Sequence, residues 1–353
     1  MYNECICIES DELEVCMVTQ MDIAREAGVS GVTVSNVING NHHKVSEENI
    51  KKIQALIEKY HYVPNATARS LAKKESRIIG VVIPNVDEND NFLKSPYNAE
   101  VLGVLERIVR AKGYYLMVRC VGSCQEIIPM VATWNVDGVV FLSAFRDDVI
   151  EIKKSMTLPM VFIDTYTKDL GESSVEADDY KGGYLVGKYL LSMGHRDILF
   201  AGPEVNGDSV IPRRFKGYKA AMAEYGVEDM VRWQYAPFTT YECGIECGRQ
   251  IASLEKVPTA VFASADILAL GIIEGLRISG KRIPEDVSIV GYDNLPEGQY
   301  SYPQLTSVSQ QITQKAELAA KQLFRQITKK DAPIKNVEVD VEIIERHSVK
   351  RML

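Results

Sequence analysis

The sequence predicts a small all-α helix-turn-helix unit at the N-terminus, followed by a larger α/β core of two parallel-sheet lobes. Between residues 19 and 60, apolar side chains recur every three or four positions, which is the spacing of amphipathic helices. From Arg77 onward, short apolar runs alternate with amphipathic segments, a pattern typical of parallel α/β folds. This second part spans about 275 residues, which is long for one sheet and favours two lobes.

Composition places the chain among soluble globular proteins. It has 353 residues, of which 46% are hydrophobic and 25% charged, and this mix excludes disorder of the whole chain. No apolar run approaches the roughly 18 residues that a membrane helix needs, so we expect no membrane partner. The formal net charge of −8 argues against a nucleic-acid partner when the chain is taken whole.

The charge is unevenly distributed along the chain. Residues 1–16 carry five acidic side chains and no Lys or Arg, whereas residues 17–76 carry eight basic and six acidic side chains. One short segment is therefore mildly basic inside an acidic protein, and a nucleic-acid partner for that segment stays open.

The first sixteen residues lack the basic start and the long apolar stretch of a secretory signal. We therefore expect a cytoplasmic protein whose seven cysteines are free thiols. No spacing of Cys and His completes a four-ligand zinc set, so neither a metal nor another cofactor is expected. We interpret residues 1–16 as an extension from a mis-assigned start, with Met17 as the true first residue.

Three helices are predicted in the N-terminal unit. Thr19 suits the N-cap of the first helix, and Gly28 suits the turn that ends it. Ser30 caps a second helix over residues 31–38, and the short turn containing Gly28 gives the helix-turn-helix form. A third helix is predicted from Ser46 to Tyr60, where apolar residues form a stripe along one face.

The second predicted helix carries small, uncharged residues on its outward side, which suit contact with a DNA major groove. Asn side chains pair with adenine edges, and Val and Thr methyl groups contact thymine. Ser and Thr hydroxyls reach phosphates. The alternative is a plain three-helix unit that uses this face for protein contact. The residues expected at a DNA surface are Ser30, Val32, Thr33, Ser35, Asn36 and Asn39.

The segment after the third helix suits a DNA minor groove. Pro64 ends the third helix, and residues 66–72 are long enough for about two helical turns, which are marginal in water by themselves. Leu71 stands beside the basic Arg69 and Lys73, as in proteins that insert an apolar wedge between base pairs. The alternative is a flexible linker.

Five stretches of this part together resemble the lactose/galactose repressor (LacI/GalR) family of transcriptional regulators. They are residues 22–30, 33–35, 37–40, 62–65 and 68–71. The resemblance implies a homodimer whose paired hinge helices bind the minor groove of a palindromic, double-stranded DNA operator. It assigns Leu71 as the wedge and places Ala68 at the contact between hinge helices. Asn36 stands where many members carry a base-reading Arg, so we expect an unusual operator half-site.

The core resembles the same family and the sugar-binding periplasmic proteins that share its fold. The matching stretches are residues 136–138, 194–196, 214–218, 258–260, 269–271, 284–293 and 303–308. Strands are expected at 78–84, 115–119, 139–142, 160–163, 198–201, 260–263 and 288–291, with a helix near 99–110. Ligands of such folds bind beyond the carboxyl ends of the strands, so we expect an effector site between the two lobes.

The candidate effector residues lie mainly at predicted strand ends. Asp164 and Asp293 each end a strand, and carboxylates accept hydrogen bonds from the paired hydroxyls of sugars or nucleosides. Arg214 suits bidentate donation, and an aromatic ring stacks on a sugar or a base. The alternative for each is a local role, as a helix cap or in the core, and we expect Asp266 to be a cap. The full set is Tyr97, Asn98, Asp164, Arg214, Phe238, Asp293 and Gln310.

Three departures from the family pattern affect this site. Asn98 stands where a second aromatic residue is common, Ala265 replaces a usual Asn, and Thr165 replaces a frequent Arg. We therefore expect a roomier pocket or an unusual effector.

The expected function is a ligand-responsive transcriptional repressor. Its domains are the extension 1–16, a DNA-binding domain at 17–62, a hinge at 63–77, and an effector-binding and dimerisation domain at 78–353. The expected effector is a sugar or sugar derivative, and the alternatives are a purine or nucleoside sensor and a solute-binding protein without regulatory role. An enzyme is disfavoured because the dinucleotide, phosphate-loop and nucleophile-elbow motifs are absent from the sequence.

Overall fold

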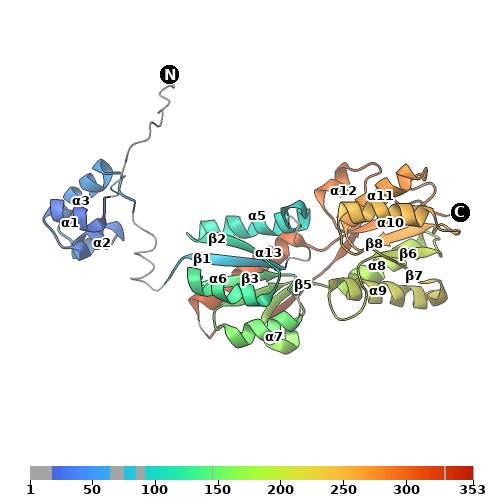
Figure 1. The fold of residues 1–353 in the computed structure, drawn as a ribbon, viewed down its shortest axis with the longest axis horizontal. Helices are drawn as coiled ribbons and strands as arrows, with labels where there is room; N and C mark the ends of the chain where they lie inside the picture. The colour runs from blue at the N-terminus through green and yellow to red at the C-terminus, as the bar shows by residue number, and fades with distance from the viewer. Residues whose placement is uncertain (1–17, 64–74, 85–91, 145, 330, 353) are drawn as a thin grey trace, which may run out of the picture. The chain divides into compact units, whose positions relative to one another are not determined.

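The computed structural model describes residues 18–63, 75–84, 92–144, 146–329 and 331–352. The chain divides into two compact units between Ser76 and Arg77. The extension 1–16 and most of the predicted hinge, including Ala68, Arg69 and Leu71, lie outside the described residues. Figure 1 shows the helices and strands of each unit.

The described part of the N-terminal unit, residues 18–63, contains three α-helices around a small apolar core. They are α1 (Gln20–Ala27), α2 (Gly31–Ile38) and α3 (Glu47–Lys59), with a short 3-10 helix η1 (His42–Lys44) before α3. Ile23, Val34 and Ile53, one from each α-helix, are fully buried. Because each helix buries only one face, the three stabilise one another by packing more than by intrinsic propensity.

The helix ends follow the capping residues that the sequence offers. Thr19 and Asp22 form a capping box at the start of α1, and Ser30 and Ser46 accept backbone N–H bonds at the starts of α2 and α3. Gly28 ends α1 with φ of 70°, a left-handed conformation that residues with a Cβ adopt at a cost. The predicted helix-turn-helix is confirmed by this geometry.

The second unit consists of two α/β lobes, each with a six-stranded sheet between helices (Figure 1). The N-lobe sheet has the order β11-β5-β4-β3-β1-β2 and the C-lobe sheet the order β12-β10-β9-β8-β6-β7. All described strand pairs are parallel except β10 with β12, which is antiparallel. The expected pair of parallel-sheet lobes is confirmed, with β12 as the exception.

The elements of the N-lobe are β1 (Ile78–Pro84), η2 (Phe92–Lys94), α5 (Pro96–Ala111), β2 (Tyr115–Val121), η3 (Cys124–Glu126), α6 (Ile127–Trp134), β3 (Gly138–Leu142), α7 (Arg146–Ser155), β4 (Met160–Ile163), η4 (Lys168–Leu170), β5 (Ser173–Ala177), α13 (Ile312–Thr328) and β11 (Asn336–Val339). Those of the C-lobe are α8 (Asp179–Ser192), β6 (Ile198–Gly202), α9 (Val210–Glu224), η5 (Glu228–Met230), β7 (Arg232–Tyr235), α10 (Tyr241–Ala252), β8 (Ala260–Ala263), α11 (Asp266–Ile278), β9 (Ser288–Asp293), α12 (Pro296–Tyr300), β10 (Thr306–Ser309) and β12 (Glu342–Ile344). The central strands are continuous apolar runs, as expected where helices cover both faces of a sheet.

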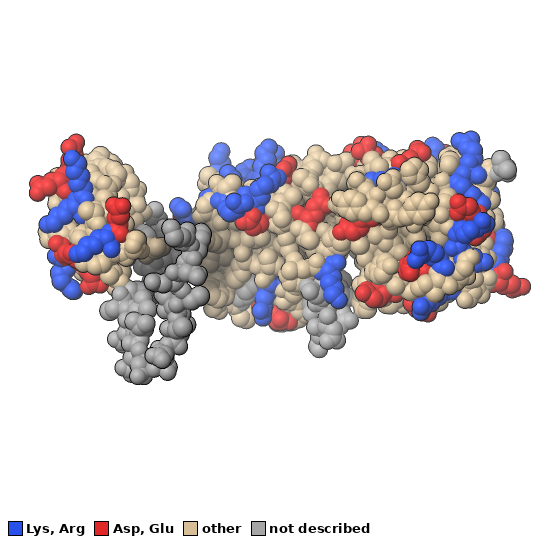
Figure 2. All heavy atoms as spheres, turned by 90° about the horizontal axis from the view of Figure 1, so that it is seen from above, with Lys and Arg blue, Asp and Glu red and all other residues tan. Residues whose placement is uncertain are grey.

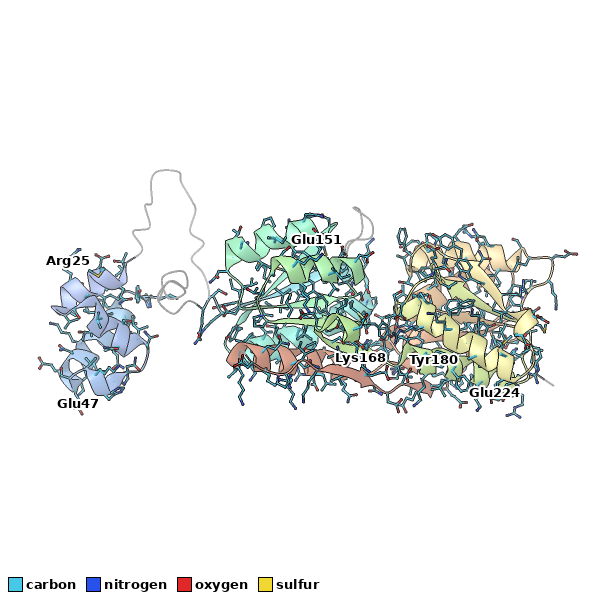
Figure 3. All side chains as sticks on the ribbon, turned by 90° about the horizontal axis from the view of Figure 1, so that it is seen from below. Arg25, Glu47, Glu151, Lys168, Tyr180 and Glu224 are labelled. Carbon is cyan, nitrogen blue, oxygen red and sulfur yellow. The ribbon has the colours of Figure 1, made fainter. Side chains whose placement is uncertain are left out.

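The chain passes between the lobes three times. The first crossover joins β5 to α8, the second joins β10 to α13, and the third joins β11 to β12. The second crossover includes Gln310 and Gln311, and Gln311 has φ of 53°. Figure 3 shows Lys168 on the N-lobe and Tyr180 on the C-lobe, on either side of this junction.

Helices α8 and α9 approach each other closely because glycines face the contact. A Cβ on Gly183 would lie 1.8 Å from the carbonyl oxygen of Arg214, and a Cβ on Gly217 would lie 1.9 Å from that of Tyr180. Only glycine fits at such a contact. The close approach fixes the backbone that carries Arg214 at the lobe junction.

Among the described residues, no helix combines the length and the apolar character required to cross a bilayer. In the same part of the chain, no group of three or more His, Cys, Asp and Glu side chains is arranged to hold a metal ion.

Candidate nucleic-acid interface and effector site

Helix α2 presents the predicted DNA-reading residues in two groups. Ser30 and Thr33 belong to the cap, because the Thr33 N–H donates to Ser30 Oγ at 3.2 Å and the two hydroxyls lie 3.0 Å apart. At the other end, Asn39 Nδ2 donates to the Ser35 carbonyl oxygen at 2.7 Å and to Ser35 Oγ at 3.2 Å. These four side chains fix the ends of the helix, although their oxygens also face solvent.

Val32 and Asn36 form the open part of the same helix. Val32 is 70% exposed, so its two methyl groups are open to contact from outside the unit. Asn36 is partly exposed, and within the described chain its side chain has no hydrogen bond. An exposed methyl pair beside a free carboxamide matches the donors, acceptors and methyl groups of base edges in a major groove.

The scaffold behind this face is tied together by polar contacts between α1 and α3. Lys59 Nζ lies 2.8 Å from Glu26 Oε1, and the Tyr60 hydroxyl donates to Glu26 Oε2 at 2.6 Å. These hydrogen bonds, from Lys59 first and then from Tyr60, lower the pKa of Glu26. Arg25 pairs with Asp22 within α1, and Figure 3 shows Arg25 and Glu47 on the outside of the unit.

In the core, Asp164 and Asp293 occupy the positions that the sequence predicted for them. Asp164 directly follows β4 and Asp293 ends β9, so one comes from each lobe. Both are 8% exposed, and both have positive φ, at 56° and 122°. Non-glycine residues persist in such conformations where the surrounding structure holds them, often at ligand sites.

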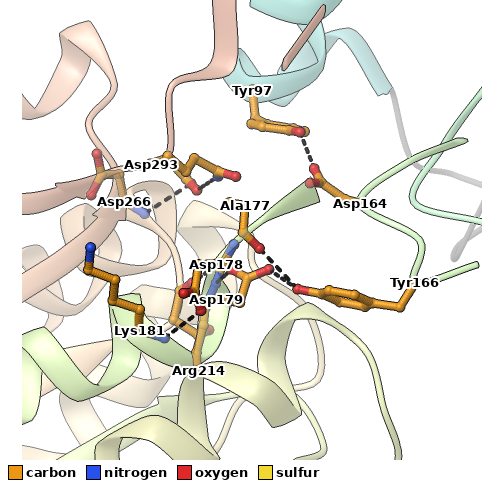
Figure 4. A network of polar contacts seen from close by, with 12 residues as sticks. Tyr97, Asp164, Tyr166, Ala177, Asp178, Asp179, Lys181, Arg214, Asp266 and Asp293 are labelled. Atoms are coloured by element: carbon orange, nitrogen blue, oxygen red, sulfur yellow. Dashed lines mark hydrogen bonds and ion pairs between the residues drawn. The ribbon is translucent and has the colours of Figure 1, made fainter. Parts of the chain in front are cut away.

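A chain of polar contacts connects these two carboxylates. The Tyr97 hydroxyl donates to Asp164 Oδ2, which Figure 4 shows, and Lys315 Nζ lies 2.6 Å from Asp164 Oδ1. The same ammonium donates to Gln310 Oε1 at 2.5 Å, and Gln310 Nε2 donates to Asp293 Oδ1. Tyr97, Asp164, Gln310 and Asp293, all predicted from the sequence, are therefore brought together.

Burial raises the pKa values of Asp293 and Tyr97. Burial raises the pKa of Asp293 to about 6, although the charge of Arg214 and the hydrogen bond from Gln310 act in the opposite direction. Burial also raises the pKa of Tyr97 well above its usual value, and the charge of Asp164 adds to the effect. Tyr97 therefore acts as a hydrogen-bond donor at neutral pH.

Arg214, on α9, belongs to a neighbouring network beside the first crossover. Its Nε lies 2.7 Å from Asp179 Oδ1, and its Nη1 donates to the Ser264 carbonyl oxygen at 2.6 Å. Tyr166 of the N-lobe donates to Asp179 Oδ2 at 2.6 Å (Figure 4). Arg214 also stacks on Tyr292, with Cζ 3.6 Å from the ring centre. The guanidinium thus keeps further N–H groups for other acceptors.

Two predicted effector residues lie apart from these networks. Asn98 Nδ2 donates to the Phe92 carbonyl oxygen at 3.2 Å, so its side chain fixes the segment before α5. Phe238 is half-buried in the connection between β7 and α10. Neither residue forms a hydrogen bond or ring contact with the described members of these networks.

The expected cap role of Asp266 is wrong. Ala265 holds the N-cap position of α11 and makes no side-chain cap bond. Asp266 instead accepts hydrogen bonds from the Leu295 N–H at 2.8 Å and from Ser307 Oγ at 2.6 Å. Burial, followed by the nearby charge of Asp293, raises the pKa of Asp266. Asp266 therefore holds the segment that follows β9 in place.

Sequence reasoning missed Lys315, Asp179, Tyr166 and Ser264. Lys315 lies in an amphipathic helix, and the sequence pattern predicts that a single Lys in such a helix faces solvent. Asp179 follows another Asp at a helix start, and this position predicts a helix-capping role. Ser264 Oγ is buried with no hydrogen-bond partner in the described structure, and no local pattern marks it. The available signal was position alone, because Asp179 and Ser264 follow buried strands.

Two hollows lie near the N-lobe elements. One of about 400 Å³ is lined by α5 and α13, where Figure 2 shows Lys and Arg side chains gathered. Its charged lining residues are Lys112, Glu317, Lys321, Arg325 and Lys329. A smaller one of about 30 Å³ lies at the carboxyl ends of β1 and β2, the edge where ligands of such folds bind. Neither includes Asp164, Arg214 or Asp293.

Comparison with known proteins decides the family. The model for bacterial regulatory proteins of the lacI family matches residues 19–65, and the model for the periplasmic binding protein-like domain matches residues 188–349. The HTH-type transcriptional repressor PurR of Mannheimia succiniciproducens is 33% identical over 342 residues, which cover 95% of this chain and 100% of the relative. The chain belongs to the LacI family of bacterial regulatory proteins.

Other LacI-family proteins agree with this assignment. PurR of Pasteurella multocida is 32% identical and covers 96% of this chain and 100% of its own length. A LacI-family regulator of Enterococcus faecium with bound ribose has a TM-score of 0.70 and 28% identity, over 78% of this chain and 100% of that chain. The lac repressor dimer bound to operator and the anti-inducer ONPF shares the fold, with a TM-score of 0.82 and 24% identity over 94% of this chain and 99% of that chain.

Proposed function

We propose that this LacI-family chain is a cytoplasmic transcriptional repressor that binds a palindromic operator as a homodimer and responds to a small effector bound between its lobes. The observation that carries the proposal is a buried polar set drawn from both lobes: Asp164, Asp293 and Gln310 at strand ends and the second crossover, and Arg214 on α9. The same chain carries a helix-turn-helix unit with an open α2 face. A sensor and a DNA reader in one chain support regulation by ligand.

The operator contacts divide by chemistry. Val32 and Asn36 supply direct base contacts from α2, and Ser30, Thr33, Ser35 and Asn39 supply hydroxyl and amide contacts at its ends. Arg69 and Leu71 supply the minor-groove contacts, with Ala68 where hinge helices of two subunits meet. Because two half-sites are read by two-fold symmetry, a homodimer accounts for a palindromic operator.

The preferred effector is a sugar or sugar derivative. Asp293 has no ion-pair partner within the described residues, so its carboxylate is available to accept hydrogen bonds from hydroxyl groups. Arg214 retains N–H donors, and two aromatic side chains were predicted to stack on the ligand: Tyr97 in the first turn of α5, and Phe238 in the connection between β7 and α10. A LacI-family relative is described with bound ribose, which supports this class.

The second candidate effector is a purine base or nucleoside. The observation that favours it is the name PurR, which the similar repressors share over nearly the whole chain. Ring nitrogens and exocyclic amino groups use the same carboxylate and guanidinium partners as sugar hydroxyls do. A solute-binding protein without regulatory role is disfavoured by the helix-turn-helix unit.

Regulation follows from differential binding to two arrangements of the lobes. An effector that contacts both lobes favours one arrangement about the three crossovers, and operator affinity changes with that population. Coupling of this kind is typically about 1–3 kcal/mol.

A thermal-shift screen of the full chain tests the effector class. The panel contains D-ribose, other mono- and disaccharides, sugar phosphates, hypoxanthine, guanine and nucleosides. A ligand at 100 times its dissociation constant stabilises the folded state by about 2.7 kcal/mol. Stabilisation by sugars supports the first candidate and stabilisation by purines the second. If Asp293→Asn abolishes the ligand-induced rise in melting temperature, the ligand binds at the site that contains Asp293. An unchanged rise in this variant contradicts binding at that site.

A further inference from the structure

Lys315 is a fully buried lysine in the N-lobe. It lies on α13, three residues after this helix begins at the second crossover, and its side chain has 0% exposure. Lysine is almost never fully buried unless its ammonium is paired, because removing that charge from water is costly. The position therefore requires partners that compensate for the burial.

The chain itself supplies acceptors for all three N–H donors of Lys315. The ammonium lies 2.6 Å from Asp164 Oδ1, 2.5 Å from Gln310 Oε1 and 3.0 Å from the Tyr97 hydroxyl oxygen. These partners come from three places: the end of β4, the second crossover and the first turn of α5. The bonding capacity of the ammonium is therefore filled without an effector.

Gln310 extends this arrangement into the C-lobe. Its oxygen accepts from Lys315, and its Nε2 donates to Asp293 at the end of β9. Asp293 Oδ2 in turn lies 3.5 Å from the backbone N of Asp266 at the start of α11. One ammonium and one amide thus form a continuous polar path from the strand end of one lobe to the strand end of the other.

The backbone at both ends of this path has a conformation that non-glycine residues seldom adopt. The φ angles are 56° at Asp164 and 122° at Asp293. Such conformations are maintained when side-chain contacts hold them. The path supplies those contacts, because Lys315 and Tyr97 hold Asp164 and Gln310 holds Asp293.

We propose that Lys315 is a positioning residue of the effector site and that it couples the two lobes through Gln310. In this role Tyr97 and Asp164 bind Lys315 and not the effector. Its regulatory meaning rests on the proposed function, whereas the coupling belongs to the chain without ligand. Asp293 is then the carboxylate that accepts hydrogen bonds from a neutral effector, and Arg214 is the donor beside it. An effector that contacts Asp293 competes with Gln310 and thereby weakens the coupling.

A simpler role for Lys315 is neutralisation of the buried Asp164 charge. The two roles differ in what Gln310 does, because a neutral amide cancels no charge but carries the path to the C-lobe. They also differ for a variant in which both charges are removed together. Neutralisation predicts that such a variant behaves like the native chain, whereas coupling predicts that the lobes stay uncoupled.

Hydrogen exchange of the full chain without ligand, followed by mass spectrometry, separates these roles. The variants are Lys315→Met, Lys315→Met with Asp164→Asn, and Gln310→Met, and the matched control is Lys321→Met, an exposed lysine on the same helix. The readouts are amide exchange in peptides that cover residues 306–312 and 176–180, and the urea midpoint of unfolding. The neutral double variant keeps the test available if Lys315→Met alone fails to fold.

Coupling predicts that exchange at both crossovers becomes at least ten-fold faster in the double variant and in Gln310→Met, while Lys321→Met matches the native chain. It also predicts that the double variant regains a urea midpoint close to native without regaining slow exchange. Native exchange rates in the double variant or in Gln310→Met overturn the proposal. These results do not depend on whether a sugar or purine binds, so a failed ligand screen leaves them interpretable.

Discussion

The Nε of Arg214 lies 2.7 Å from Oδ1 of Asp179, and both side chains are buried, at 5% and 0% exposure. The pair joins α9 to the first residue of α8, directly after the first crossover. Tyr166, in the N-lobe segment between β4 and η4, donates to the same carboxylate, so Asp179 links α8 to α9 and to the N-lobe. Breaking this pair leaves a buried charge without its partner.

We expect Asp179→Ala to destabilise the chain by about 3–5 kcal/mol, because the Arg214 guanidinium is then buried and unpaired. Urea unfolding followed by circular dichroism measures the loss. The control is Glu106→Gln, which breaks the exposed pair with Arg110 and is expected to cost no more than about 1 kcal/mol. Equal effects of the two substitutions contradict the structural importance of the buried pair.

The contribution of Asp293 to stability is expected to fall as the pH rises from about 4 to about 6. Burial raises the pKa of Asp293 to about 6, so the folded chain holds a proton that the unfolded chain has already released. The resulting penalty is absent below the unfolded pKa, near 3.8, and complete above about 6. Unfolding free energies of the native chain and of Asp293→Asn across this range test it. An identical pH slope in both assigns the effect to other groups.

Asn36→Ala is expected to weaken binding to the cognate operator by about 1–3 kcal/mol, because the free carboxamide on α2 is proposed to contact a base edge. The salt dependence of binding should change little, since no phosphate contact is removed. Fluorescence anisotropy with selected and scrambled DNA measures both. Lys52→Ala on α3 is the control, and a uniform loss on both DNAs by Asn36→Ala argues against base reading.

Leu71→Ala is expected to reduce operator affinity while leaving the stability of the chain unchanged, because the side chain is proposed to act as a minor-groove wedge. Gel-shift titration with the native operator measures the effect, and urea unfolding provides the control. Operator affinity that is the same for Leu71→Ala and the native chain would contradict the proposed wedge role of Leu71.

Gly183→Ala is expected to destabilise the core by about 1–3 kcal/mol or to prevent folding, because its Cβ would lie 1.8 Å from the Arg214 carbonyl oxygen. Gly103→Ala on α5 is the control, since a Cβ there meets no atom within 4 Å. Thermal unfolding of both variants checks the contact. Matching melting temperatures would show that α8 and α9 tolerate a wider spacing.

The apolar strands and the capped helices were predictable from local pattern. Continuous apolar runs identified β1, β3 and β4, and Ser30 and Ser46 identified helix starts. Strand β5 was not predicted, because its Ser and Glu side chains interrupt the apolar run although all five residues are buried. The sequence also did not predict four further strands, β7, β10, β11 and β12, because they are three or four residues long and partly polar.

The candidate site was predictable where residues end strands, as with Asp164 and Asp293. It was not predictable where a contact joins distant segments. Lys315 lies 151 residues from Asp164, and no local pattern shows that a lysine on an amphipathic helix faces inward. Asp266 matched the pattern of a helix cap, but in the folded core its carboxylate accepts hydrogen bonds from the Leu295 N–H and from Ser307 Oγ.

The most direct test of the account is the operator affinity of the full-length chain with and without effector. The operator is obtained by selection from random DNA, and the effector is the ligand that the thermal-shift screen identifies. Anisotropy titrations at fixed salt then give the two dissociation constants. The account predicts a palindromic site bound by a dimer and at least a five-fold change in affinity at saturating effector. Operator affinity that is the same with and without saturating effector would contradict it.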